Sequence, residues 1–214
     1  MNGLVAKPLP VSWVLASASP RRQELLGRLL AAEIEVLVPE VEELHDQGLG
    51  GEALTLHNAA LKARAASLQR PQSLCLGADT LVLRDGIALG KPGSMAEAET
   101  MLLSLSGRWH EVWTSVWVRC AMCGLDRGFS SCSRVRMRSM NAELVRNYHG
   151  MVNPMDKAGA YGIQEHGELI VECLDGSFSC VMGLPLEALA QELIGLGLSS
   201  CLRQDWDMKN PTSW

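Results

Sequence analysis

Val11-Ser-Trp-Val-Leu-Ala-Ser-Ala-Ser-Pro-Arg-Arg22 passes from an apolar run to hydroxyl residues, a proline and two arginines. The apolar run predicts a buried first strand over residues 11–16. Ser19 followed by Pro20 predicts a helix start, because serine caps a first turn and proline is favoured at the first helical position. The helix is expected over residues 20–32, where four leucines form an apolar stripe.

The rest of the chain continues this alternation of strand and helix. Gly77-Ala-Asp-Thr80 is expected in or at the end of a strand, and Asp85-Gly86 predicts a hairpin turn. In the strand 109–119, His110, Val112, Thr114, Val116 and Val118 are expected to share one face. Further strands are expected at 34–38, 74–76, 81–83, 133–138 and 169–174, and helices at 51–68, 95–105, 141–149 and 185–196. Interleaved strands and helices indicate an α/β fold.

Length and composition set the organisation of the chain. Its 214 residues, 47% of them apolar, suit one domain with a sizeable core, expected over 12–197 between a leader (1–11) and a tail (198–214). The net charge of −5 disfavours nucleic acid as a partner. No apolar run is long enough for a membrane span and no signal peptide is recognised. Seven cysteines at irregular spacing, without an export signal, indicate reduced thiols and a cytoplasmic protein. Cys120-x-x-Cys123 has no second pair to complete a zinc motif.

Arg21 and Arg22 lie in the first turn of the predicted helix. Free backbone N–H groups, the positive end of the helix dipole and guanidinium forks together favour a phosphate site. An ordinary helix start with solvated arginines gives the same pattern, so the residues alone leave both interpretations open.

Asp79 places a carboxylate in an apolar strand, where it would activate water or hold a metal, or cap a turn. Lys62 and Lys91 are candidate phosphate ligands, although a lone lysine is usually solvated. Glu40, Glu42 and Glu43 form a charge run that is either a solvated face or a source of magnesium ligands. No Walker motif and no GxSxG motif occurs.

Taken in order, the blocks resemble the Maf family of nucleoside triphosphate pyrophosphatases, once described as septum-formation proteins. The resemblance covers about residues 12–196. The blocks are Leu15-Ala-Ser-Ala-Ser-Pro-Arg-Arg-Gln-Glu-Leu-Leu26, Pro39-Glu-Val-Glu-Glu43, Lys62-Ala63, Gly77-Ala-Asp-Thr80, Leu89-Gly-Lys-Pro92, Leu105-Ser-Gly-Arg-Trp-His-Glu-Val-Trp-Thr114, Met155-Asp-Lys-Ala-Gly-Ala-Tyr-Gly-Ile-Gln164 and Gly176-Ser-Phe-Ser-Cys-Val-Met-Gly-Leu-Pro-Leu186.

The resemblance implies hydrolysis of a nucleoside triphosphate to the monophosphate and pyrophosphate, with dTTP and UTP, and modified pyrimidine nucleotides, as candidate substrates. It implies Asp79 as proton acceptor and Arg21, Thr80 and Gln164 as the residues that set substrate preference. It also implies an elongated mixed sheet with two lobes around a central cleft, a Maf/ITPase-like fold, and a homodimer. Phosphate contacts are expected from Ser17, Arg22, Lys62 and Lys91, and a divalent metal (Mg²⁺, or Mn²⁺ or Co²⁺) on Glu42 and Asp79.

Two alternatives stay open at this point. One is a nucleotide-binding regulator of cell division that needs no catalysis, and the other is a pyrophosphatase that prefers 7-methyl-GTP. The chain departs from the family pattern at Cys180 and at the three tryptophans of the strand 109–119, and none of these changes removes an expected catalytic group.

Overall fold

A computed structural model describes residues 12–45 and 48–207 of the chain. The predicted leader, residues 1–11, lies outside the described residues. The strands are β1 (Trp13–Ala16), β2 (Ile34–Val36), β3 (Leu74–Arg84), β4 (Ile87–Leu89), β5 (Trp109–Cys120), β6 (Leu125–Met137) and β7 (Val171–Asp175). The α-helices are α1 (Pro20–Leu29), α2 (Gly51–Gln69), α3 (Met95–Ser104), α4 (Ala142–Met151), α5 (Phe178–Met182) and α6 (Leu186–Gly195), and short 3-10 turns follow at Ala158–Ala160, Gly167–Leu169 and Ser199–Cys201.

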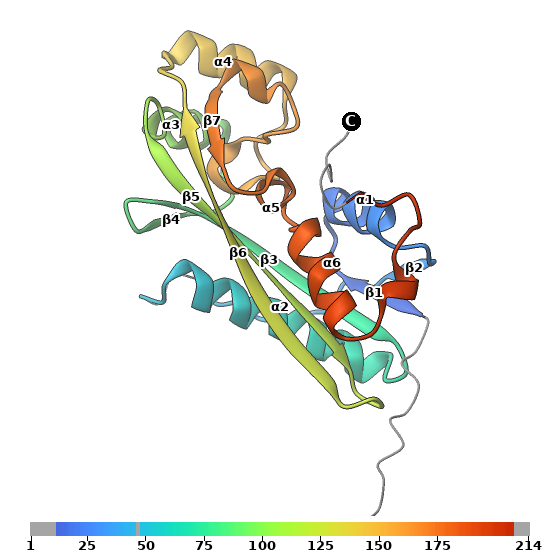
Figure 1. The fold of residues 1–214 in the computed structure, drawn as a ribbon. Coiled ribbons are helices and arrows are strands. Elements are labelled where there is room, and N and C mark those ends of the chain that lie inside the picture. Colours follow the sequence, from blue (N-terminus) through green and yellow to red (C-terminus); the bar gives the residue numbers. More distant parts are fainter. Residues whose placement is uncertain (1–11, 46–47, 208–214) are drawn as a thin grey trace, which may run out of the picture.

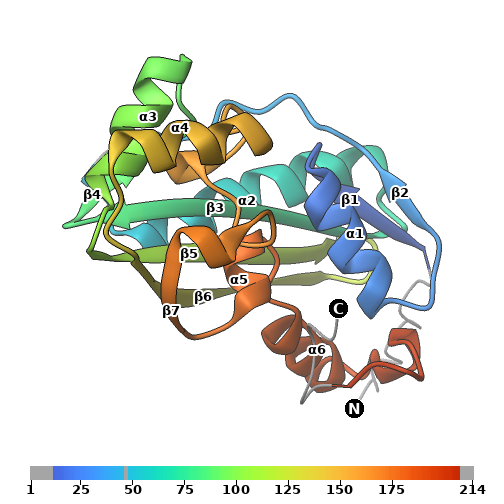
Figure 2. The same ribbon diagram turned by 90° about the horizontal axis from the view of Figure 1, so that it is seen from above.

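The strands form one mixed sheet in the order β2-β1-β3-β5-β6-β7, and β4 pairs with β3 off this path. β1 pairs in parallel with β2 and β3, whereas β5, β6 and β7 continue from β3 in antiparallel pairs. The long strands β3, β5 and β6 form the middle of an elongated molecule, with α1 and α6 toward one end and α3 and α4 toward the other (Figures 1 and 2). The predicted α/β class and elongated mixed sheet are confirmed.

Helices cover both faces of the sheet. Neighbouring residues of β5 show this, because strand side chains alternate between faces. Thr114 donates a hydrogen bond to the Cys180 carbonyl of α5, whereas the Ser115 hydroxyl bonds that of Thr55 on α2. α2 therefore packs on one face and α5 on the other, and the predicted shared face of His110 to Val118 is confirmed by the burial of those alternate residues.

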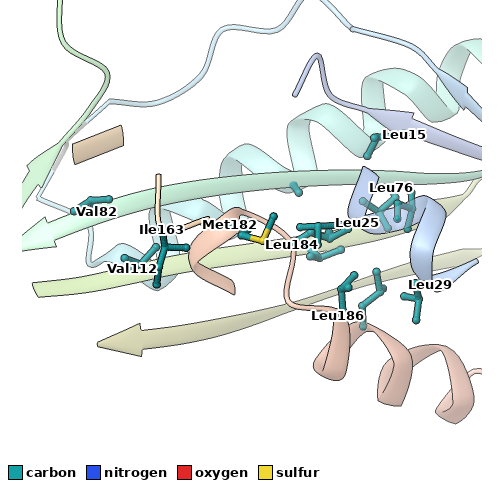
Figure 3. Packing of buried hydrophobic residues seen from close by; sticks show 14 of the residues in the cluster. Leu15, Leu25, Leu29, Leu76, Val82, Val112, Ile163, Met182, Leu184 and Leu186 are labelled. Carbon is teal, nitrogen blue, oxygen red and sulfur yellow. The ribbon is translucent and has the colours of Figure 1, made fainter. Parts of the chain in front are cut away.

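The core lies between the sheet and the helices on the α5 side. Figure 3 shows leucines of β1, α1, β3 and α6 packed together with Met182 and Leu184. The leucine stripe predicted for α1 packs into this core, and Leu25, Leu26 and Leu29 are almost wholly buried. Within residues 12–45 and 48–207, no helix has the length and hydropathy needed to cross a membrane.

Several element boundaries differ from the predicted ones. The strand expected at 133–138 begins at Leu125, because its polar first half pairs with β5 along its whole length. Gly77-Ala-Asp-Thr80 lies inside one continuous strand, β3. α1 ends at Leu29, three residues early, because Leu30 leaves the helix and forms an isolated bridge with Leu202.

Through that bridge, residues 199–207 pack against the end of α1. The Ala31 N–H donates to the Cys201 carbonyl, and the Arg203 N–H donates to that of Leu29. Their division from the domain as a tail stays a prediction, and residues 208–214 lie outside the described part.

Candidate active site

A gap in the edge of the sheet opens the main cleft. The pairing of β1 with β3 ends at Gly77, and that of β4 with β3 begins at Val82. Between them, within the described chain, residues 78–81 of β3 pair with β5 on one side only. A cleft of about 970 Å³ lies there, lined by Arg21, Arg22, Glu42, Glu43, Asn58, Lys62, Asp79, Thr80, Lys91, Asp156, Lys157, Tyr161, Gln164 and their neighbours. An exposed strand edge lets a ligand approach groups from both faces of a sheet.

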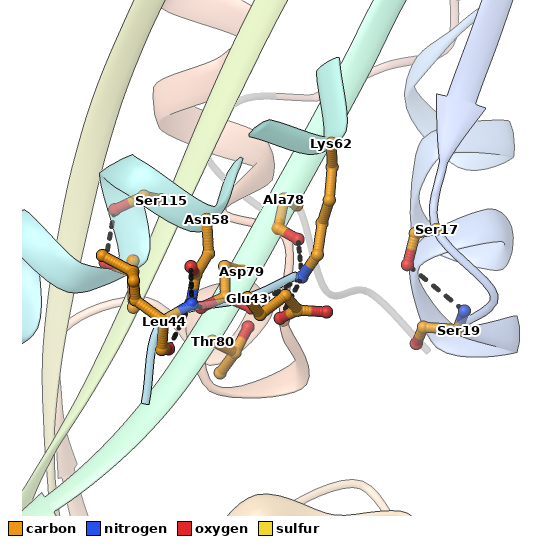
Figure 4. A network of polar contacts seen from close by, with 12 residues as sticks. Ser17, Ser19, Glu43, Leu44, Asn58, Lys62, Ala78, Asp79, Thr80 and Ser115 are labelled. Atoms are coloured by element: carbon orange, nitrogen blue, oxygen red, sulfur yellow. Dashed lines mark hydrogen bonds and ion pairs between the residues drawn. The ribbon is translucent and has the colours of Figure 1, made fainter. Parts of the chain in front are cut away.

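Asp79 points to the α2 side of this gap (Figure 4). Its Oδ1 accepts from Lys62 Nζ at 2.8 Å, and its Oδ2 accepts from Asn58 Nδ2 at 3.2 Å. Lys62 Nζ also lies 2.8 Å from Glu43 Oε2 and is only 11% exposed. One ammonium therefore holds two carboxylates at the cleft wall, which leaves this cluster with a net negative charge.

Asn58 and Gly77 explain how α2 and the segment before it reach the strand. The Asn58 amide accepts from the Leu44 N–H at 2.9 Å and donates to its carbonyl at 3.1 Å, which places Glu43 beside Lys62. A Cβ on Gly77 would lie 2.2 Å from the Ala59 carbonyl oxygen. Glycine thus permits the close approach that brings Lys62 to Asp79.

Thr80 points to the opposite face of β3, where Arg22 holds it. Arg22 donates from Nη2 to Thr80 Oγ1, from Nη1 to Ser17 Oγ and the Ala78 carbonyl, and from Nε to the Gly183 carbonyl, all within 3.1 Å. Four of its five N–H donors are thereby used inside the protein. Burial lowers the pKa of Arg22, and the nearby charges of Asp79 and Glu43 act against that shift.

The proton of the Thr80 hydroxyl is also used. Thr114 Oγ1 gives its only proton to the Cys180 carbonyl at 2.8 Å, so Thr80 must be the donor in the 3.0 Å bond between the two threonines. Thr80 therefore presents only a remaining lone pair to the cleft.

The predicted helix start holds, since Ser19 caps α1 by accepting from the Arg22 N–H, and Pro20 is the first helical residue. Arg21 extends from this start toward the segment 155–165. Its Nη1 lies 3.1 Å from Asp156 Oδ2 and 3.9 Å from Glu165 Oε1. Gln164 joins the same group through Nε2, which donates to Glu165 Oε1 at 2.9 Å.

Lys91 and Glu42 are exposed residues of the cleft wall. Among residues 12–45 and 48–207, neither forms an ion pair or hydrogen bond, so both side chains remain available to a ligand. In that same part of the chain no three His, Cys, Asp or Glu side chains converge as a ready-made metal cage. Glu42, Glu43 and Asp79 nevertheless supply hard oxygen donors to one cleft, which fits Mg²⁺, since this ion commonly takes one or two carboxylates and completes its shell with phosphate and water.

Tyr161 lines the cleft, and its hydroxyl is bonded to His110. His110 Nε2 and the Tyr161 hydroxyl are 2.7 Å apart, and both side chains are buried. Burial lowers the pKa of His110 to about 4 and raises that of Tyr161. The histidine is therefore neutral near pH 7 and acts as a packing and hydrogen-bonding group.

The structure brings all the predicted site residues to one region of the fold. Ser17 lies next to the main cleft, in a smaller adjoining pocket, and the other predicted residues line the cleft itself. Sequence reasoning missed Asn58, Asp156, Lys157 and Glu165. Asp156 and Lys157 lie inside the block Met155–Gln164 already noted, whereas Asn58 carried only one signal, its position one helical turn before Lys62.

Comparison with known proteins places the sequence in a family. A family model described as Maf-like protein matches residues 12–196, which is most of the chain. The chain belongs to the Maf family. The Maf blocks of the sequence include β1–α1, the gap in β3 and the segment 155–164, which are the elements that build the cleft.

Maf proteins similar to this one carry a shared description, dTTP/UTP pyrophosphatase. One from Akkermansia muciniphila is 41% identical over 184 residues, or 86% of this chain and 96% of its own. One from Methylococcus capsulatus is 46% identical over 188 residues, 87% of this chain and 92% of its own. One from Symbiobacterium thermophilum is 43% identical over 190 residues, 86% and 93% of the two chains.

Proposed function

We propose that this Maf protein is a nucleoside triphosphate pyrophosphatase that hydrolyses dTTP and UTP to the nucleoside monophosphate and pyrophosphate. The observation that carries the proposal is the Asp79 carboxylate, held by Lys62 and Asn58 at an unpaired strand edge. The shared description of the similar proteins supplies the substrate class.

Asp79 serves as the general base in this proposal. Water attacks the α-phosphorus, a new P–O bond forms, the bond to the bridging oxygen breaks and pyrophosphate leaves with the electron pair. Asp79 accepts the proton of the attacking water, a contribution of about 10²–10⁴ in rate. Lys62 and Asn58 orient the carboxylate for this transfer.

Cations of the cleft compensate the charge of the triphosphate. Lys91 is free to contact phosphate oxygens, and Arg21 carries its charge at the α1 N-terminus, where backbone N–H groups also favour anions. Ser17, Lys62 and Arg22 complete the phosphate-binding set, and Arg22 also fixes Ser17 and Thr80. A Mg²⁺ ion on Glu42 and Asp79, with Mn²⁺ or Co²⁺ as substitutes, would polarise the phosphates.

Arg21, Thr80 and Gln164 set the preference for the nucleobase in this proposal. Thr80 and Gln164 both line the cleft, where Thr80 accepts a hydrogen bond from Arg22 and Gln164 donates one to Glu165, which lies near Arg21. A homodimer follows from the family resemblance and is checked by light scattering of the purified chain.

The test measures pyrophosphate release from a panel of dTTP, UTP, CTP, GTP and 7-methyl-GTP while magnesium is titrated. We expect dTTP and UTP to be the best substrates and Asp79→Asn to reduce turnover by about 10²–10⁴. Asp85→Asn makes the same chemical change on the exposed β3–β4 turn and serves as the matched control.

Equilibrium dialysis with UTP separates catalysis from binding. Asp79→Asn should still bind UTP, because the cations remain in place. Full turnover by this variant would exclude Asp79 as the base, and binding without any turnover by the unaltered protein would favour the regulator hypothesis.

A further inference from the structure

Gln164 has an amide whose orientation is fixed by a neighbour. Its Nε2 donates to Glu165 Oε1 at 2.9 Å. An ionised carboxylate only accepts hydrogen bonds, so the nitrogen of the amide faces Glu165 and the oxygen faces away from it. Residues 12–45 and 48–207 give Gln164 Oε1 no hydrogen bond, and the side chain lines the cleft. The oxygen is therefore the part of Gln164 that is free for a ligand.

Glu165 is itself held in place. Its Oε2 lies 3.2 Å from Nζ of Lys157, a lysine whose side chain is only 5% exposed. Lys157 Nζ is anchored on its other side by the Asn153 carbonyl at 2.7 Å and by Asp156 Oδ1 at 3.0 Å. Gly162 leaves room for this lysine because it has no Cβ. A Cβ at this position would lie 2.9 Å from Lys157 Cε. The buried ammonium of Lys157, with three partners, thus holds the Glu165 carboxylate in place, and that carboxylate orients the Gln164 amide.

A free acceptor in this position can distinguish among pyrimidines by hydrogen bonding. Uracil and thymine carry an N–H donor at ring position 3, where cytosine carries an unprotonated nitrogen with a lone pair. A fixed acceptor facing that position bonds the first two bases and repels the third. Sites that bond a substrate polar group reject analogues that lack it far more strongly than apolar pockets do.

We propose that Glu165 is a positioning residue that makes Gln164 an acceptor for N3–H of uracil and thymine, and thereby favours uridine and thymidine nucleotides over cytidine nucleotides. This inference rests on the proposed function and adds to it the atom that is read and the residue that orients it. Glu165 does not touch the base. It acts by preventing the Gln164 amide from turning its nitrogen toward the cleft.

The central experiment compares kcat/KM for UTP and CTP in the purified full chain and in Glu165→Ala. With the carboxylate gone, the Gln164 amide is free to rotate and offer Nε2 to the cytosine lone pair. We expect the UTP-to-CTP ratio to fall by about tenfold, the value of one hydrogen bond of about 1.4 kcal/mol. Glu168→Ala removes an exposed carboxylate three residues away and should leave the ratio unchanged.

A second variant separates orientation from structural damage. Glu165→Gln keeps an oxygen acceptor of the same reach but can also donate, so its ratio should lie between those of the unaltered protein and Glu165→Ala. Equal losses for UTP and CTP in both variants, with the ratio unchanged, would mean a merely structural role and would overturn the proposal.

N3-methyluridine triphosphate tests the same contact without any substitution in the protein. The methyl group replaces the N3 proton, so we expect this nucleotide to be hydrolysed at least about tenfold less efficiently than UTP. Hydrolysis at the rate of UTP would overturn the proposal although dTTP and UTP remain substrates. Failure of the proposed function would look different, since neither UTP nor dTTP would then release pyrophosphate.

Discussion

The two sides of the cleft are built in different ways. The carboxylate side consists of Glu43, Asn58, Lys62 and Asp79, and it rests on one long helix, α2, packed against one long strand, β3. The amide side consists of Arg21, Asp156, Lys157, Gln164 and Glu165, and it is formed where an irregular segment meets the start of α1.

Charge also differs between the two sides. On the carboxylate side one ammonium faces two carboxylates, so the cluster is short of positive charge and suits a metal ion or the proton of an attacking water. On the amide side two cations balance two carboxylates, and the neutral amide of Gln164 lines the cleft beside them. This contrast suggests that one side performs the chemistry and the other selects the base.

Gly77→Ala should give the largest effect and separate the two sides. The added Cβ would lie 2.2 Å from the Ala59 carbonyl and 2.7 Å from the Ala63 nitrogen, so α2 must move and carry Lys62 away from Asp79. We expect kcat/KM for UTP to fall by about 10²-fold, as a displacement of about 1 Å can cause. Because the amide side does not rest on α2, the UTP-to-CTP ratio should be kept.

Gly27→Ala is the control, since a Cβ there meets nothing within 4 Å. A Gly77→Ala protein that loses its base preference together with its rate would contradict the independence of the two sides. Thermal denaturation of both variants reports the accompanying loss of stability, about 1–3 kcal/mol for an overpacked site.

The two sides of the cleft also differ in how well the sequence predicted them. On the carboxylate side, the sequence predicted a helix around Lys62 and a strand around Asp79, and the family blocks identified these two residues, whereas Asn58 was missed. The gap along the edge of β3 was not predicted. It depends on where the pairing with β1 ends and the pairing with β4 begins, while β3 itself continues.

The amide side was harder to predict. Gln164 was identified through the family blocks, but its partner Glu165 was not, because nothing in residues 155–165 shows which side chains turn toward Arg21. Arg22 was expected to bind phosphate, yet most of its donors are used on carbonyls and hydroxyls brought in from β3 and the α5–α6 connection. Such contacts follow from tertiary packing and have no local sequence signal.

His110→Gln tests how the buried partner of Tyr161 contributes to stability. Burial lowers the pKa of His110 to about 4, whereas in the unfolded chain it titrates near 6.5. Between these values the unfolded state binds more protons, so the contribution of His110 is complete above about pH 6.5 and is lost as the pH falls toward 4. The loss amounts to roughly 3 kcal/mol for this shift.

Urea denaturation of both proteins from pH 7 to pH 4 measures the effect. The drop in free energy of unfolding should be smaller in His110→Gln by roughly 3 kcal/mol. His149, whose pKa burial also lowers, is present in both proteins and cancels in the comparison. Identical pH profiles would show that His110 does not couple protonation to folding.

Gln164→Glu should have the smallest effect on rate and the clearest effect on preference. The substitution replaces the donor that faces Glu165 by an oxygen, so two carboxylates meet where a 2.9 Å hydrogen bond stood. The new side chain turns toward the cleft and presents only acceptors. Guanine carries adjacent N–H donors on its hydrogen-bonding edge and pairs with such a group, whereas uracil offers one donor between two acceptors. We expect the ratio of UTP to GTP efficiency to fall by about tenfold, measured across the triphosphate panel.

Gln191→Glu makes the same change on an exposed position of α6 and should leave the ranking as it is. If both variants rank the nucleotides as the unaltered protein does, Gln164 is not the residue that reads the base, and the selective role assigned to Gln164 moves to Arg21 and Thr80.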